Sequence, residues 1–98
     1  MTKRLDSSNS ITTDNTPLDF PCEFPIKAMV HSTEQARSAV FGAVAEHVSF
    51  DVDNDVRRRP SRNGRFESIT ISVKVESRGQ LERIYGDIRS LDVVLMTL

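Results

Sequence analysis

One stretch of the sequence, residues 66–76, constrains the fold more than any other. It reads Phe-Glu-Ser-Ile-Thr-Ile-Ser-Val-Lys-Val-Glu and alternates between apolar and polar side chains over four periods. Its apolar positions are Ile69, Ile71, Val73 and Val75, and its polar positions are Ser68, Thr70, Ser72 and Lys74. A period of two built from β-branched residues is typical of a strand with one face in a core and the other toward water. We therefore predict a central strand here.

The first residues of the chain differ in composition from the rest. Residues 1–19 are rich in Ser, Thr, Asn and Asp and contain few large apolar side chains. Burial in such a segment does not offset the entropy lost on ordering. We predict that residues 1–19 are a disordered tail and that residues 20–98 form one domain with a modest core of two layers.

A strand and a helix are predicted before the central strand. The strand follows from alternating apolar residues at Ile26, Ala28 and Val30. Ser32, with Gln35 three residues later, predicts the N-cap of a helix that runs from Glu34 to about Val48. The apolar stripe of this helix comprises Ala36, Val40, Ala43, Val44 and Val48.

A second strand is predicted immediately before the central one. Phe50, Val52 and Val56 alternate with aspartates, which favours a charged strand at a sheet edge. Asn63-Gly64 then predicts a turn, because this dipeptide accommodates the positive φ angles of tight hairpins. The second and third strands should form a long hairpin.

The remaining chain predicts one more helix and one more strand. Ser77 and Gln80 form a capping box, and four apolar residues follow at helical spacing. These residues are Leu81, Ile84, Tyr85 and Ile88. A closing strand is predicted over residues 93–98, with Val93 and Leu95 on one face and Val94, Met96 and Leu98 on the other.

The order of these elements, βαββαβ, predicts an α+β, ferredoxin-like, two-layer sandwich. Right-handed crossovers place both helices on one face of a four-stranded antiparallel sheet. The predicted strand order is 4-1-3-2.

Four short sequence patterns are spread over residues 20–98. They are Phe20-Pro21 followed by Phe24, then Lys27-Ala28-Met29, then Pro60-Ser61 with Gly64 before residues 66–71, and finally residues 91–98. Together they resemble the YbeD-like family of small bacterial proteins of unknown function. The resemblance implies a ferredoxin-like fold similar to the ACT regulatory domains of amino-acid metabolism. It implies no established activity and offers no catalytic residues to transfer.

Composition limits the classes of function. The formal net charge is -1, which argues against a general polyanion binder. Cys22 is the single cysteine, so an internal disulfide is excluded and a reducing compartment is favoured. The sequence has no apolar run of membrane-spanning length, and residues 1–19 lack the apolar region of a signal peptide. We expect a cytoplasmic protein.

The acidic run in the predicted second strand resembles the start of a calcium loop. Asp51, Asp53 and Asp55 place oxygen ligands at alternate positions. The sixth position, which requires glycine, is Val56, and the twelfth, which requires glutamate, is Arg62. We therefore interpret the run as the solvated face of an edge strand.

No other set of residues has the spacing of a catalytic or metal site. Cys22, His31 and His47 are not arranged as metal ligands or as a nucleophile with its base. The sequence also lacks a glycine-rich phosphate loop and a nucleophile elbow. We predict no enzymatic activity, no cofactor and no metal.

The sharpest chemical feature is a cluster of arginines in the predicted hairpin. Five of the ten arginines lie there, and they form our candidate anion contact: Arg57, Arg58, Arg59, Arg62 and Arg65. Guanidinium groups suit phosphate or carboxylate partners. The alternative is a solvated hairpin whose charges discourage edge pairing. RNA binding by the open sheet face is disfavoured, because the face predicted from the first and third strands offers no aromatic platform for stacking.

These observations favour a non-catalytic regulatory or interaction module that binds a small metabolite or a protein partner. Accessory RNA binding through the arginine-rich hairpin is the alternative. We expect a monomer or a weak homodimer, with candidate interface residues Arg37, Phe41, Val94 and Met96. For Phe41 we also consider packing within its own domain, near Phe20 or Phe24.

Overall fold

The structure, a computed structural model, describes residues 19–98. Apart from Asp19, the predicted tail lies outside the described residues. In chain order the elements are β1 (Cys22–His31), α1 (Glu34–Ala45), α2 (Val52–Asp55), β2 (Val56–Pro60), β3 (Phe66–Val75), α3 (Arg78–Arg89) and β4 (Val94–Thr97). No helix in this part of the chain has both the length and the apolar character needed to cross a membrane.

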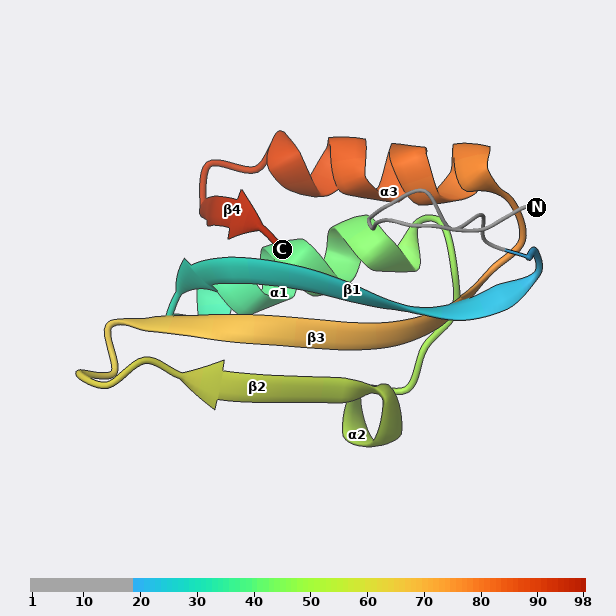
Figure 1. Ribbon diagram of the computed structural model, residues 1–98. Coiled ribbons are helices and arrows are strands. Elements are labelled where there is room, and N and C mark those ends of the chain that lie inside the picture. Colours follow the sequence, from blue (N-terminus) through green and yellow to red (C-terminus); the bar gives the residue numbers. More distant parts are fainter. Residues whose placement is uncertain (1–18) are drawn as a thin grey trace, which may run out of the picture.

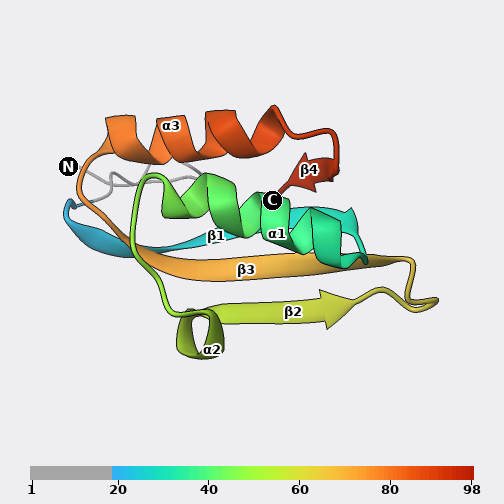
Figure 2. The same ribbon diagram turned by 180° about the vertical axis from the view of Figure 1, so that it is seen from behind.

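The four strands form one antiparallel sheet in the order β2-β3-β1-β4. The two long helices, α1 and α3, lie on the same side of this sheet (Figures 1 and 2). This arrangement is the ferredoxin-like α+β fold, and the predicted strand order is confirmed. One face of the sheet is therefore covered by helices, and the opposite face, called the open face below, is left without a helix.

The core lies between the helices and the inner face of β1 and β3. The predicted alternation of the central strand is confirmed, because every second residue of β3 from Ile69 to Val75 is buried. The core residues are Ile26, Ala28, Val30, Ala36, Val40, Val44, Ile69, Ile71, Val73, Val75, Leu81, Ile84 and Ile88. The helices contribute the apolar stripes expected from their 3.6-residue period.

β1 is longer than its apolar alternation suggested. It pairs with β3 from Cys22 opposite Val75 to His31 opposite Phe66. Pro25 lies within this strand, although proline has no N–H to donate. Pairing with β4 begins only at Ala28, so β1 has one free side at Pro25 and tolerates proline there.

The start of the first helix differs from the prediction. Thr33, and not Ser32, is the N-cap of α1, and its hydroxyl accepts a hydrogen bond from the N–H of Ala36 at 3.0 Å. Ser32 instead donates its hydroxyl to Glu67 on β3. The helix also ends earlier than predicted, at Ala45, and the carbonyl of His47 beyond it accepts a hydrogen bond from the Gln80 side chain.

The prediction of a strand starting at Phe50 is wrong. Asp51 caps a single helical turn, α2, by accepting a hydrogen bond from the N–H of Asp53 at 2.9 Å. The backbone N–H of Asp51 in turn donates to the Asp55 carboxylate at 2.8 Å. Aspartate is a strong N-cap residue, and this local exchange of hydrogen bonds outweighs the weak apolar alternation. Val52 is consequently 52% exposed, and β2 begins at Val56.

The hairpin and the second capping box agree with the predictions. Gly64 has a φ of 77°, which is the conformation that favours glycine in a tight turn. At the start of α3, the Ser77 hydroxyl accepts a hydrogen bond from the N–H of Gln80 at 3.1 Å. The Gln80 side-chain carbonyl accepts from the N–H of Glu76 at 2.7 Å, one residue before the N-cap.

Tyr85 connects α3 to β1 and should leave a signature in the pH dependence of stability. Its ring contacts the edge of Phe24, and burial raises its pKa above 10.0, partly offset by a backbone hydrogen bond from Lys27 and by the charge of Arg89. The folded state therefore holds the phenolic proton more tightly than the unfolded state does. This contribution to stability is present below the unfolded pKa and is lost as the pH rises through the folded pKa.

We expect the free energy of unfolding to fall as the pH rises from about 10, the ordinary pKa of tyrosine, through the raised pKa of Tyr85 in the folded state. The fall should be steeper in the natural chain than in Tyr85→Phe, because phenylalanine has no proton to release. Urea denaturation across this range measures the difference. Parallel curves for the two proteins would contradict the assignment.

Candidate anion-binding face of the sheet

The pairing of β2 with β3 divides the arginine cluster between the two faces of the sheet. Arg57 lies opposite Thr70, and Arg59 lies opposite Ser68. Residues directly opposite in an antiparallel pair project to the same side. Because the intervening residue of β3, Ile69, is buried under the helices, Arg57 and Arg59 lie on the open face.

β1 adds a third cation to the same region. Lys27 lies opposite Thr70 on the other side of β3, and it is exposed. A hollow of about 420 Å³ opens between these strands. It is lined by Lys27, Arg57, Arg58, Arg59, Ser68, Thr70 and Leu98. The open face therefore carries a hollow with cations around it and two hydroxyl groups in its floor.

Within the described residues, the cations on the open face take no part in ion pairs. Within residues 19–98, the ion pairs are those of Glu67 with Arg37 and Arg58 and that of His47 with Asp87. None of them involves Lys27, Arg57 or Arg59. A guanidinium group binds carboxylate or phosphate through paired N–H donors, and hydroxyls add further donors. The chemistry of the hollow thus suits an oxyanion.

Arg58 also borders the hollow, but its guanidinium group contacts a carboxylate on the helix side of the sheet. It lies opposite Ile69, and its Nη1 is 3.5 Å from Oε2 of Glu67. Glu67 is only 4% exposed, and its Oε1 accepts hydrogen bonds from Arg37 at 2.9 Å and from the Ser32 hydroxyl at 2.8 Å. A buried carboxylate needs such partners, because an unpaired buried charge is costly. The Arg37–Glu67 pair joins α1 to the sheet.

Glu67 was not among the predicted site residues, although the sequence carries a signal for it. The alternation that buries Ile69, Ile71 and Val73 places residue 67 on the same face. A charged residue on a core face predicts a cationic partner nearby. That partner is Arg37, which lies thirty residues earlier in the sequence, and only the fold brings it to Glu67.

Arg62 and Arg65 lie in the hairpin turn beyond β2 and are exposed. The turn is held by the Asn63 side-chain oxygen, which accepts hydrogen bonds from the N–H of Arg65 and from the Ser61 hydroxyl. Neither arginine lines the hollow. The five candidate arginines therefore divide into three groups, two on the open face, one at Glu67 and two in the turn.

The four candidate interface residues come from two elements, Arg37 and Phe41 from α1 and Val94 and Met96 from β4. Arg37 pairs with Glu67, and Phe41 is partly buried, with its ring 6.1 Å from that of Phe50. Phe24 was predicted as a possible neighbour of Phe41, but its ring packs against the ring of Tyr85. Arg37 and Phe41 thus both have contacts within the domain itself.

β4 departs from a simple alternation of faces. Val94 lies opposite Val30 on the core side, whereas Met96 lies opposite Met29 on the open face, because the register shifts between Met29 and Val30. Such a bulge breaks the alternation of a strand. The expectation that Val94 and Met96 share a face is therefore wrong. Met96 is 52% exposed, as is usual for a side chain at the border of an open face.

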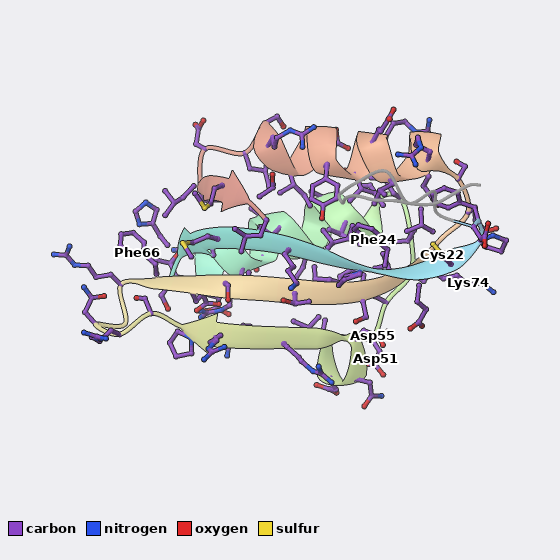
Figure 3. All side chains as sticks on the ribbon, in the orientation of Figure 1. Cys22, Phe24, Asp51, Asp55, Phe66 and Lys74 are labelled. Atoms are coloured by element: carbon purple, nitrogen blue, oxygen red, sulfur yellow. The ribbon has the colours of Figure 1, made fainter. Side chains whose placement is uncertain are left out.

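Phe66 lies on the open face, where the sequence had predicted no aromatic platform. Phe66 continues the alternation of Ser68 and Thr70, and its ring is 5.3 Å from that of His31 (Figure 3). The pair lies at the end of the sheet beside the hairpin turn. It offers a single stacking position, whereas RNA-binding sheets of this fold stack two or three bases.

The remaining histidine and the acidic turn form no metal site. His47 Nε2 is 2.6 Å from Asp87 Oδ2, and this contact joins the end of α1 to α3. Asp51 caps α2 and Asp55 ends it; the Asp51 N–H donates to the Asp55 carboxylate, and the Asp55 N–H donates to the Asp51 carbonyl (Figure 3). In the described part of the chain, no three His, Cys, Asp or Glu side chains gather as metal ligands would.

Comparison with known proteins places the chain in a family. The model of a protein family described as "Protein of unknown function (DUF493)" matches residues 15–98. The chain belongs to the DUF493 family. This membership confirms the YbeD-like resemblance.

Curated relatives agree with this assignment. A UPF0250 protein of Neisseria gonorrhoeae is 33% identical over 81 residues, covering 83% of this chain and 89% of the relative. A UPF0250 protein of Nitrosomonas europaea is 31% identical over 86 residues, covering 88% of this chain and 99% of the relative. Their names state no activity, and the family description gives none.

Two solved structures share the fold. The solution structure of protein HP0495 from H. pylori has a TM-score of 0.69 and 20% sequence identity, and covers 93% of this chain and 98% of the other. The C-terminal domain of the MgtC protein from Mycobacterium tuberculosis has a TM-score of 0.59 and 11% identity, and covers 84% of this chain and 89% of the other. These likenesses show the fold alone.

Proposed function

We propose that this protein is a small, non-catalytic binding module whose open sheet face binds an anionic group of its ligand. The group, a carboxylate or a phosphate, would occupy the hollow between Arg57, Arg59 and Lys27. The observation that carries the proposal is the position of these three cations around two hydroxyls, with no ion pair to a carboxylate within residues 19–98.

The geometry supports a ligand-binding role for these three cations rather than a contribution to solubility alone. Arg57 and Arg59 are two residues apart on β2, so both project to the open face. Across the sheet, Thr70 on β3 lies between Arg57 and Lys27. The sheet fixes the backbone at these positions, so binding an anion orders the side chains of Lys27, Arg57 and Arg59 but no loop. The lining holds no histidine, aspartate or glutamate side chain that would activate the hydroxyl of Ser68 or Thr70 as a nucleophile, which supports a non-catalytic role.

Titration with small anions tests the proposal. We expect inorganic phosphate and citrate to raise the melting temperature and to shift the backbone amide resonances of Arg57, Arg59 and Thr70. Arg57→Gln with Arg59→Gln should weaken binding by about 2 kcal/mol, or roughly thirtyfold, because two charged donors are lost. Added sodium chloride should weaken binding as well.

Arg78→Gln with Arg83→Gln is the matched control for this titration. These arginines are exposed on α3, on the helix side of the molecule, so their loss removes the same charge without touching the hollow. Equal weakening by the two double variants would contradict a site on the open face. Resonance shifts confined to the hairpin turn would contradict it too.

Single-stranded RNA is a second candidate ligand, favoured by the Phe66–His31 pair at the end of the same face. Aromatic stacking contributes about 1–3 kcal/mol per base. Phe66→Ala should then weaken RNA binding and leave phosphate binding unchanged. A salt-dependent binding assay with a short RNA, on the natural chain and on Phe66→Ala, distinguishes the two candidates.

A further inference from the structure

The two edges of the sheet differ in charge. β4 forms one edge, and its residues, Val94–Thr97, include no charged side chain. β2 forms the other edge and carries Arg57, Arg58 and Arg59 in succession. An edge strand has a row of N–H and C=O groups that no neighbouring strand satisfies. Figure 1 shows β2 at the border of the sheet, with α2 at its beginning.

The arginines of β2 match the side-chain period of an added strand. Arg57 and Arg59 lie on the open face, while Arg58 between them faces the other way and contacts Glu67. An extended segment paired with β2 would also alternate its side chains with a period of two. Acidic side chains at its positions i and i+2 would therefore lie on the open face beside Arg57 and Arg59.

Charge selects the kind of segment that fits this edge. A second copy of the chain pairing antiparallel through β2 would place arginines of one strand opposite those of the other, which is unfavourable. At the start of β2, Asp51, Asp53 and Asp55 repel an acidic segment. At its other end, Arg62 and Arg65 in the hairpin turn attract one. The favourable positions thus run from Arg57 toward the turn.

We propose that β2 is a docking edge for an acidic, extended segment of a partner protein. The segment adds to the sheet as a further strand and places carboxylates at alternate positions against Arg57 and Arg59. The inference rests on the proposed function, because it uses the same guanidinium groups, and it names the source of the anion. Main-chain hydrogen bonds supply affinity in such an arrangement, and the alternating carboxylates supply specificity.

Two synthetic peptides test the strand addition on the full chain. The first, of about nine residues, alternates glutamate with threonine, a residue with high strand propensity. The second has the same sequence but is N-methylated at the amides that would face β2, so it keeps every charge and loses the main-chain donors. We expect the first peptide to bind, to slow amide hydrogen exchange at Val56–Arg59 and to show cross-strand contacts to β2 by NMR.

The methylated peptide should bind roughly tenfold more weakly or worse, since several main-chain hydrogen bonds are lost. Arg57→Gln with Arg59→Gln should weaken binding of the first peptide by at least about tenfold, and Arg78→Gln with Arg83→Gln should not. Melting temperatures of both double variants establish that each remains folded.

The outcomes separate the two proposals. If both peptides bind equally, the contact is one of charge alone, and strand addition is overturned while anion binding stands. If phosphate and citrate bind in the hollow but neither peptide does, the anion comes from a small molecule and the docking edge is overturned. If neither the peptides nor the small anions bind, the proposed function itself is lost. If a short RNA binds and the first peptide does not, the anionic partner is RNA and the docking edge is overturned.

Discussion

Replacing Ile71 by alanine should lower the free energy of unfolding by about 2–5 kcal/mol. Ile71 is fully buried in the middle of β3, between the sheet and the helices. Alanine removes apolar contacts and leaves a cavity. Neighbouring strands hold β3 on both sides, so the surrounding residues fill this cavity only partly. Urea denaturation with unchanged m-values measures the loss directly.

Thr70→Ala is the matched control for this substitution. Thr70 precedes Ile71 on the same strand, but its side chain lies on the open face and is only partly buried. We expect a loss of less than about 1 kcal/mol, mainly from the lower strand propensity of alanine. Similar losses from Thr70→Ala and Ile71→Ala would contradict the assignment of the two faces.

Replacing Arg37 by alanine should be almost as costly, at about 3 kcal/mol. The substitution leaves Glu67, which is 4% exposed, with the Ser32 hydroxyl at 2.8 Å and the more distant Arg58. A buried carboxylate that loses its close cation retains its desolvation cost without the compensating attraction. Chemical denaturation of Arg37→Ala near neutral pH measures the effect.

Two further variants determine whether the unpaired carboxylate of Glu67 causes this loss of stability. Arg58→Ala should cost less than about 1 kcal/mol, because Arg58 is half exposed and its contact with Glu67 is 3.5 Å long. Arg37→Met combined with Glu67→Met should recover much of the loss, because a buried pair exchanged for apolar side chains leaves no orphan charge. If the double variant is no more stable than Arg37→Ala, the buried charge is not the source of the instability.

Periodicity predicted the elements that form the core. The strands at β1 and β3 and the buried stripes of α1 and α3 were predicted from apolar spacing, because burial on one face imposes that spacing. Strand order followed from the right-handed crossover rule, which holds for nearly all folds of this kind. These features needed no knowledge of any particular contact.

Local hydrogen bonding explains the errors at element boundaries. Asp51 was interpreted as one of several strand residues, although aspartate also caps helices, and α2 results from that second property. Ser32 and Thr33 are both good N-caps, and the choice between them was decided by Glu67, which binds the Ser32 hydroxyl and leaves Thr33 to cap α1. The Val94–Met96 error has a similar origin, because a bulge in β4 is set by its neighbour β1.

The sequence by itself determined the fold class, the core residues of the sheet and the presence of an arginine-rich edge. These depend on composition and on periods of two and 3.6 residues, which are properties of neighbouring positions. Only the tertiary structure decided which arginines are available to a ligand. Arg58 contacts Glu67 because β2 pairs in one register with β3, and the same register places Arg57 and Arg59 beside Lys27 from a strand thirty residues earlier. Register and burial follow from packing the whole chain, since a shift of one residue would exchange the two faces.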